Sequence, residues 1–188
     1  MASHTSIMPR TPIINRDQMR KIESIGDSSV IRISVMNEGN ANDTIEVGSA
    51  FLGETPERQK VLFTARHLFS AVEDTKLTLK CENGALDTMF TIPLDEYDRE
   101  QLFLVDDPDS AAIILNDDLI RQCQLGGSAF VSIGEFEPIL KQITIQRFPK
   151  CGQLSLSTGW ITEINEERFS HNAGSEQGSS GSLVLELE

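Results

Sequence analysis

The stretch GSSGS at residues 178–182 runs directly into the apolar segment LVL at residues 183–185, and it decides the predicted fold. A turn with a central serine between glycines suits a nucleophilic hydroxyl, because glycine permits backbone conformations that a Cβ would block. Backbone N–H groups of such a turn can converge on the oxygen that becomes negative during acyl transfer. Taken alone, a run of glycine and serine is more often a flexible loop. The rest of the chain therefore has to supply the partners of this serine.

Two further side chains are needed to activate a serine hydroxyl: a base, and a carboxylate that orients the base. The chain has three histidines, of which His4 lies in a polar N-terminal stretch and His171 in the segment around the serine. His67 remains, because it follows the apolar strand pattern VLFTA. Asp109 stands directly before the apolar stretch SAAIIL. The order along the chain is therefore histidine, aspartate, serine, which is one of the three known orders of this triad.

Two neighbouring carboxylates compete with Asp109 for the third role. Asp106 and Asp107 lie only a few residues before it in the sequence. A solvated acidic run is the usual role of such a cluster. Only Asp109 stands directly before the apolar strand, so it is the preferred candidate.

Four short motifs resemble those of the trypsin/chymotrypsin-like serine peptidases, especially of their intracellular and bacterial-type members. TARH at residues 64–67 resembles the Thr-Ala-x-His motif, and DSAAI at residues 109–113 is similar to Asp-x-Ala-hydrophobic-hydrophobic. GSSGS resembles Gly-Asp/Asn/Ser-Ser-Gly-Gly/Ser, and VGSAFL at residues 47–52 is close to the Gly-Ser/Thr-Gly-Phe strand that precedes the histidine. The chain order is that of chymotrypsin. The resemblance extends over roughly residues 28–188.

The resemblance implies a serine endopeptidase in which Ser180 attacks the peptide carbonyl, His67 acts as the general base and Asp109 orients the imidazole. The backbone N–H groups of Gly178 and Ser180 would form the oxyanion hole. Such a hydrolase needs no metal and no organic cofactor. The alternative hypothesis is a catalytically silent, protease-like module that binds or regulates within a larger assembly.

The segment before the serine is expected to set the substrate specificity. By the same resemblance, Gly174 and Ser175 occupy the positions where the family builds the base of its specificity pocket. His171 is a further candidate for the lining, although a surface role at the end of a strand is more common for a lone histidine. Trypsin has an aspartate where Gly174 stands, so selection of arginine or lysine by that device is not expected.

Composition limits the classes of function. The 188-residue chain carries a formal net charge of −13, which argues against binding to nucleic acid or to anionic membranes, because both require basic patches. The expected partner is a protein or peptide substrate. The sequence has no apolar run long enough to span a bilayer and no secretory signal. Its three cysteines cannot all pair within the chain and show no Cys-x-x-Cys spacing, so a cytoplasmic (intracellular) location is predicted.

Strand patterns dominate the chain, so the predicted fold class is all-β, with two antiparallel six-stranded-type barrels of the trypsin-like kind. Residues 1–27 are predicted to form an N-terminal tail and a short helix that ends at Gly26 and Asp27. Residues 28–118 are predicted to form an N-terminal barrel of six strands. Residues 119–188 are predicted to form a C-terminal barrel of about five strands, the first over residues 129–134.

The C-terminal barrel is predicted to be short at its end. The chain ends eight residues after Ser180, whereas the family that it resembles continues through further strand segments that wall the specificity pocket. The barrel is therefore expected to lack about one strand and to leave an unpaired edge. Truncation of a longer protein is the favoured explanation. The others are partner domains or a second chain that completes the barrel, and an incomplete site.

Overall fold

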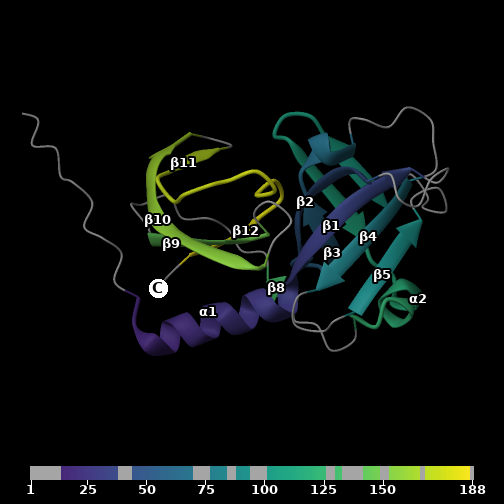
Figure 1. Ribbon diagram of the computed structural model, residues 1–188, viewed down its shortest axis with the longest axis horizontal. Coiled ribbons are helices and arrows are strands. Elements are labelled where there is room, and N and C mark those ends of the chain that lie inside the picture. Colours follow the sequence, from purple (N-terminus) through teal and green to yellow (C-terminus); the bar gives the residue numbers. More distant parts are fainter. Residues whose placement is uncertain are drawn as a thin grey trace, which may run out of the picture.

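The computed structural model describes residues 14–37, 44–69, 77–83, 88–93, 101–125, 130–132, 142–148, 153–165 and 168–186. Strands make up most of them, in two sheets whose neighbouring strands are antiparallel except for one short parallel pair. Figure 1 shows the two halves side by side, with the first half in blue and teal and the second in green and yellow. The predicted all-β class with two antiparallel halves is confirmed.

The chain enters the fold through helix α1 (Arg16–Ser29). Asn15 caps it, since its side chain accepts hydrogen bonds from two backbone N–H groups of the first turn, and Gln18 completes a capping box. The predicted end at Gly26 and Asp27 is wrong, because the helix continues to Ser29 and leads directly into the first strand. No helix among the described residues has the length and apolarity that a membrane crossing requires.

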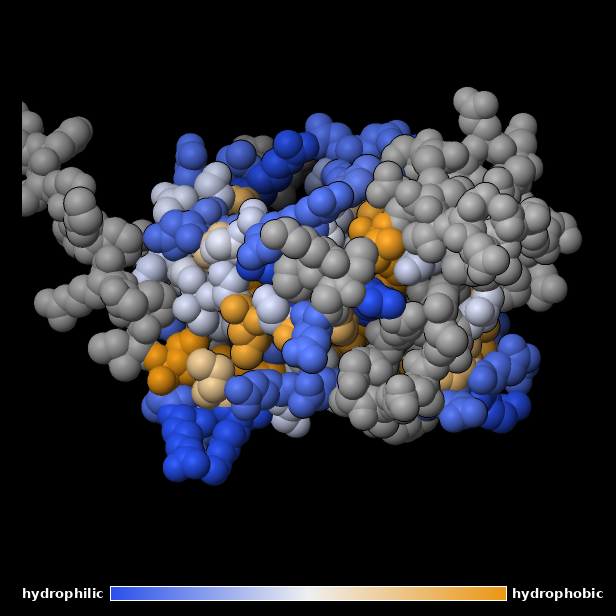
Figure 2. All heavy atoms as spheres, in the orientation of Figure 1, coloured by the Kyte–Doolittle hydropathy of each residue, from blue (hydrophilic) through white to orange (hydrophobic). Residues whose placement is uncertain are grey.

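Gly26 lies inside α1 for a packing reason. A Cβ at this position would come 2.7 Å from Nε2 of Gln146 and 3.1 Å from Cδ2 of Leu154, both in the second half of the chain. The Gln146 side-chain amide donates a hydrogen bond to the carbonyl of Ile22 on the helix. Figure 2 shows the hydrophilic side chains of α1 along the lower left edge and hydrophobic residues above them. The missing Cβ therefore lets the helix lie closely against the second sheet.

The first sheet contains eight described strands in the order β5-β4-β1-β2-β3-β7-β6, and β8 pairs with β2. All six predicted strands are present. β6 was not predicted, because three of its four residues are exposed and show no alternation of polar and apolar residues. Of the strand predicted over residues 129–134, Val131 and Ser132 form β8 and pair with β2 of the first sheet, whereas residues 129, 133 and 134 lie outside the described residues. The strands are β1 (Val30–Asn37), β2 (Thr44–Glu54), β3 (Lys60–Thr64), β4 (Leu77–Asn83), β5 (Thr88–Pro93), β6 (Leu102–Val105), β7 (Ser110–Ile114) and β8 (Val131–Ser132).

Two short helical segments accompany this sheet. The 3₁₀ turn η1 (Arg66–Phe69) follows β3 and contains His67. A helical turn was predicted over residues 67–72, of which residues 70–72 lie outside the described residues. Helix α2 (Asp117–Gln122), capped by Asn116, follows β7 and was not predicted.

The second sheet has the order β11-β10-β9-β12, formed by β9 (Gln142–Arg147), β10 (Ser155–Ile164), β11 (Phe169–His171) and β12 (Leu183–Glu186). The strand pattern predicted over residues 154–157 together with 160–164 forms the single strand β10. Within the described part of the chain, β12 pairs with β9 on one side only. Completion of this edge by a further strand, and the predicted domain limits, stay predictions.

Alternation along the strands explains the cores. In β1, Ile31, Ile33 and Val35 are fully buried and belong to the core of the first half. In β9, Ile143 and Ile145 belong to a smaller cluster within the second half. A third cluster, which includes Val30, Phe148 and Leu183, joins segments of both halves. The two sheets are therefore connected by apolar packing as well as by the chain.

Candidate active site

Strand register brings His67 and Asp109 together. β3 and β7 are antiparallel, with Thr64 opposite Ala111. His67 follows Thr64 by three residues and Asp109 precedes Ala111 by two, so both lie at the same end of this strand pair. Oδ2 of Asp109 is 2.5 Å from Nδ1 of His67. The second carboxylate oxygen accepts a hydrogen bond of 2.8 Å from the backbone N–H of His67.

The environment of Asp109 keeps its carboxyl group ionised. Burial raises the pKa of Asp109, but hydrogen bonds from the His67 side chain and backbone outweigh this effect, and the pKa lies below its usual value of 3.8. An ionised Asp109 favours the tautomer of His67 with the proton on Nδ1. The other ring nitrogen, Nε2, then carries a lone pair and can accept a proton.

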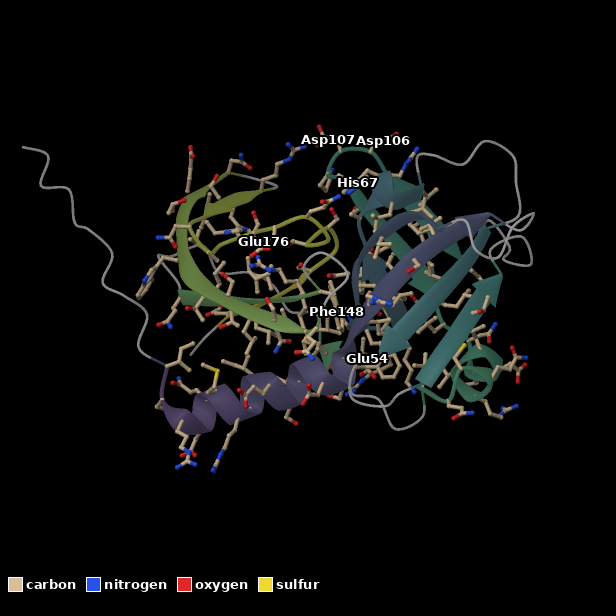
Figure 3. All side chains as sticks on the ribbon, viewed as in Figure 1. Glu54, His67, Asp106, Asp107, Phe148 and Glu176 are labelled. Atoms are coloured by element: carbon tan, nitrogen blue, oxygen red, sulfur yellow. The ribbon has the colours of Figure 1, made fainter. Side chains whose placement is uncertain are left out.

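The acidic residues before Asp109 are exposed, as predicted, and each pairs with an arginine. Oδ1 of Asp106 lies 3.1 Å from Nε of Arg66. Asp107 forms an ion pair with Arg168, which precedes β11 in the second half. Figure 3 shows His67 below Asp106 and Asp107, at the border between the two halves. Asp107 and Arg168 therefore link the loop that contains Asp109 with the second sheet.

The loop that contains Ser180 is held by β2. The backbone N–H of Ser49 donates a hydrogen bond of 2.8 Å to the carbonyl of Ser180. The hydroxyl of Ser49 donates to the carbonyl of Gly178 at 2.9 Å and accepts from the backbone N–H of Phe148 at 3.0 Å. Because Ser49 is fully buried, these bonds are shielded from water and fix the loop between the two halves.

Gly181 brings the same loop against β3. Its φ of +77° is a conformation that L side chains rarely adopt. A Cβ here would overlap the carbonyl oxygen of Ser49 and would lie 2.5 Å from Oγ1 of Thr64. That Thr64 hydroxyl donates a hydrogen bond of 2.8 Å to the same Ser49 oxygen. The serine loop thus packs against the end of β3, three residues before His67.

The turn before Ser180 contains two backbone donors without an acceptor in the described residues. Ser179 closes it, because its N–H donates to the carbonyl of Glu176 and its hydroxyl accepts from the Glu176 N–H, both at 3.0 Å. Gly178 is buried and has a φ of +86°. Among the residues that the structure describes, the N–H groups of Gly178 and Ser180 have no hydrogen-bond acceptor.

The Ser180 hydroxyl is half-buried and has no hydrogen-bond partner in the described ranges. His67 and Ser180 are therefore not hydrogen-bonded to each other in this structure. The register of β3 and the anchoring of the serine loop place both at the same border. His67 and Asp109 are thus in direct contact. Ser180 is connected to them only through the backbone of β2 and β3, to which its loop is anchored.

The residues predicted to set specificity lie in different environments. Gly174 and Ser175 are exposed, and the carbonyl of Gly174 accepts a hydrogen bond from the guanidinium of Arg147. His171 lies at the end of β11 opposite Ile161 and is half-buried. Its Nδ1 has no hydrogen-bond partner within the described ranges. A surface role therefore describes His171 incompletely.

Three residues of this region received no role from the sequence: Ser49, Thr64 and Arg147. Ser49 stands in the apolar motif VGSAFL, where a buried polar residue indicates a hydrogen-bonding task. Arg147 has the same parity along its strand as Ile143 and Ile145, which face the core. An arginine at an inward position was thus a detectable signal. In the described parts of the chain, no group of three His, Cys, Asp or Glu residues is placed to bind a metal ion.

Comparisons with known proteins bear on the fold. No protein-family model matches the chain, and no curated protein matches it in sequence. Solved structures do match: that of Deg5 has a TM-score of 0.62 and 14% identity, over 92% of this chain and 82% of that chain. The active form of the Rv3671c protease from M. tuberculosis has a TM-score of 0.58 and 16% identity, over 97% and 78%.

A further match is the serine endoprotease from Yersinia pestis, with a TM-score of 0.61 and 11% identity. It covers 93% of this chain and 55% of that chain. Identities this low support a statement about the fold only. The two antiparallel sheets and these matches show that the chain has the fold of the trypsin-like serine proteases.

Proposed function

We propose that the protein is a serine endopeptidase that hydrolyses peptide bonds through an acyl-enzyme. The observation that carries the proposal is the contact of 2.5 Å between Nδ1 of His67 and Asp109. It lies at the border where the Ser180 loop is bonded to β2 and packed against β3. A carboxylate that orients an imidazole beside a serine in a glycine turn is the arrangement that acyl transfer requires.

The proposed mechanism assigns one task to each group. The Ser180 hydroxyl attacks the substrate carbonyl while Nε2 of His67 removes its proton, and the positive imidazole is stabilised by Asp109. The N–H groups of Gly178 and Ser180 bind the oxygen that becomes negative. His67 then returns the proton to the leaving amine, and water hydrolyses the ester on Ser180. The absence of a hydrogen bond between Ser180 and His67 is compatible with this scheme, because catalytic hydrogen bonds often form fully only when substrate binds.

A second candidate function is a catalytically silent, protease-like binding or regulatory module. The missing hydrogen bond between Ser180 and His67 favours it. In that case the backbone donors near Gly178 would bind a ligand without cleaving it. The proposed chemistry uses no metal or organic cofactor in either case. An intracellular location, supported by the odd number of cysteines, belongs to the same proposal.

A serine-directed fluorophosphonate separates the two candidates. The native chain should be labelled at Ser180, as read by mass spectrometry of its peptides, and Ser180→Ala should abolish labelling. Ser182→Ala is the matched control, since Ser182 lies in the same turn and its hydroxyl donates a hydrogen bond to the Ser179 carbonyl. Labelling that persists in Ser180→Ala, or a native chain that is not labelled, would refute the proposed nucleophile.

A further inference from the structure

The guanidinium of Arg147 is buried beside the candidate site. Arg147 is the last residue of β9 and only 5% exposed. It donates a hydrogen bond to the carbonyl of Gly174, while its Nε is buried without any partner in the described ranges. No carboxylate among the described residues pairs with it. A buried cation that lacks an anion is costly, so an arginine in this position indicates a ligand with negative charge.

Arg147 is connected to the Ser180 loop at two points. Gly174, which accepts its hydrogen bond, precedes Ser180 by six residues in the same loop. The residue after Arg147, Phe148, donates its N–H to the Ser49 hydroxyl, and that hydroxyl donates to the Gly178 carbonyl. The arginine and the proposed oxyanion hole are thus held by the same set of hydrogen bonds.

Two polar groups lie close to Gly174. A Cβ on Gly174 would lie 3.5 Å from Oγ of Ser157 and 4.0 Å from Nη2 of Arg147, which is ordinary contact. The β9–β10 register places Ser157 on the same sheet face as Arg147, because Ser155 pairs with Arg147 and Ser157 follows two residues later. A hydroxyl and a guanidinium that approach one point are suited to a carboxylate, which accepts short, charge-assisted bonds from both.

We propose that Arg147 selects substrates with an acidic side chain, glutamate or aspartate, immediately before the cleaved bond. This inference rests on the proposed function for cleavage, but the recognition itself requires only binding. The net charge of −13 repels acidic peptides at long range. That repulsion is screened over about 8 Å at physiological salt, whereas a contact with a buried guanidinium is screened much less. The preference should therefore persist as salt concentration rises.

Binding to the Ser180→Ala variant tests the inference independently of catalysis. The probes are two fluorescent tetrapeptides that end in Glu or in Gln, both with a free C-terminal carboxylate, measured by fluorescence anisotropy. The Glu peptide should bind about tenfold more tightly or better, as expected for a charge-assisted contact. Equal affinities that fall together when both C-termini are amidated would assign Arg147 to the terminal carboxylate and overturn the proposal. Absence of binding of both peptides at millimolar concentration would also overturn it.

A substitution at Gly174 supplies the matched test, because Arg147 variants can fail to fold. Gly174 does not have a positive φ, so a side chain is tolerated there, and it would meet Nη2 of Arg147. Gly174→Asp should neutralise the arginine and reduce the Glu-to-Gln affinity ratio to about one or less. Gly174→Asn, equal in size but uncharged, should keep a ratio above one. Equal ratios in the two variants would contradict the role of Arg147.

The outcomes separate this inference from the proposed function. Fluorophosphonate labelling of Ser180 without a preference for the Glu peptide would refute acidic selection and leave the peptidase intact. A preference for the Glu peptide without labelling would support recognition by Arg147 in a silent module.

Discussion

Substitution of Gly181 by alanine should be unusually damaging for a change of one methyl group. The backbone there has a φ of +77°, and a Cβ would overlap the Ser49 carbonyl oxygen and approach Oγ1 of Thr64 to 2.5 Å. The left-handed conformation costs alanine about 1–2 kcal/mol, and overpacking of a closed site costs about 1–3 kcal/mol. The free energy of unfolding should therefore fall by about 2–5 kcal/mol.

Thermal unfolding followed by circular dichroism measures this loss. For a chain of this size, each kcal/mol lowers the melting temperature by about 2–4 °C, so a fall of about 10 °C is expected for Gly181→Ala. The same variant should also be labelled more slowly by the fluorophosphonate at temperatures where it is folded. The reason is that the loop with Ser180 must move away from Thr64 to accommodate the methyl group.

Gly174→Ala is the matched control, since it adds the same methyl group to the same loop. Gly174 has no positive φ, and its nearest neighbours would be 3.5 and 4.0 Å from the new Cβ. Its stability should change by less than about 0.5 kcal/mol. If Gly181→Ala melted at the native temperature, or if both variants lost equal stability, the packing of the serine loop against β3 would be refuted.

Three further outcomes are expected. His67→Ala and Asp109→Asn should each lower the rate of peptide hydrolysis by about 1,000-fold or more, whereas Asp106→Asn should stay within a few-fold of native; the reverse order would move the carboxylate role to Asp106. Because the pKa of Asp109 is lowered in the fold, its contribution to stability is complete above the unfolded value of 3.8 and is lost as the pH falls through the folded value. Melting temperatures between pH 6 and 2 should therefore fall less steeply for Asp109→Asn than for the native chain, and parallel curves would contradict this. Burial raises the pKa of the Cys123 thiol to about 11, so iodoacetamide at pH 8 should modify it only after unfolding, as read by peptide mass spectrometry; rapid modification of the folded chain would show an exposed thiol.

Local pattern predicted the strands well, because alternation reports which side of a strand is buried. Ile31, Ile33 and Val35 show this in β1. The end of α1 was predicted wrongly because Gly26 is a frequent helix terminator, while here it is required by the approach of Gln146 from the second half. The residues around Gly26 give no sign of a contact with a residue that lies 120 positions later in the chain. The pairing of β8 with β2 was not predicted, for the same reason.

The candidate site, too, could be predicted only in part from the sequence. His67 and Asp109 could be selected from the sequence, because each stands at one end of an apolar strand, and antiparallel pairing of these strands brings them together. The tasks of Ser49 and Arg147 depend on contacts between the two sheets. These hydrogen bonds can be inferred only when the positions of both sheets are known. The sequence did show that both residues are polar at positions expected to face the core.

The position of α1 has a consequence for how the protein is made. The helix is synthesised first, yet the surface that receives it includes Gln146, 124 residues after its partner Ile22. At ribosomal rates of about 5–20 residues per second, this separation corresponds to roughly 10 s. During that time the face of the helix that will contact Gln146 and Leu154 is without its binding surface. This face of the helix can therefore dock only after β9 has left the ribosome, and it lacks its partner in the nascent chain until then.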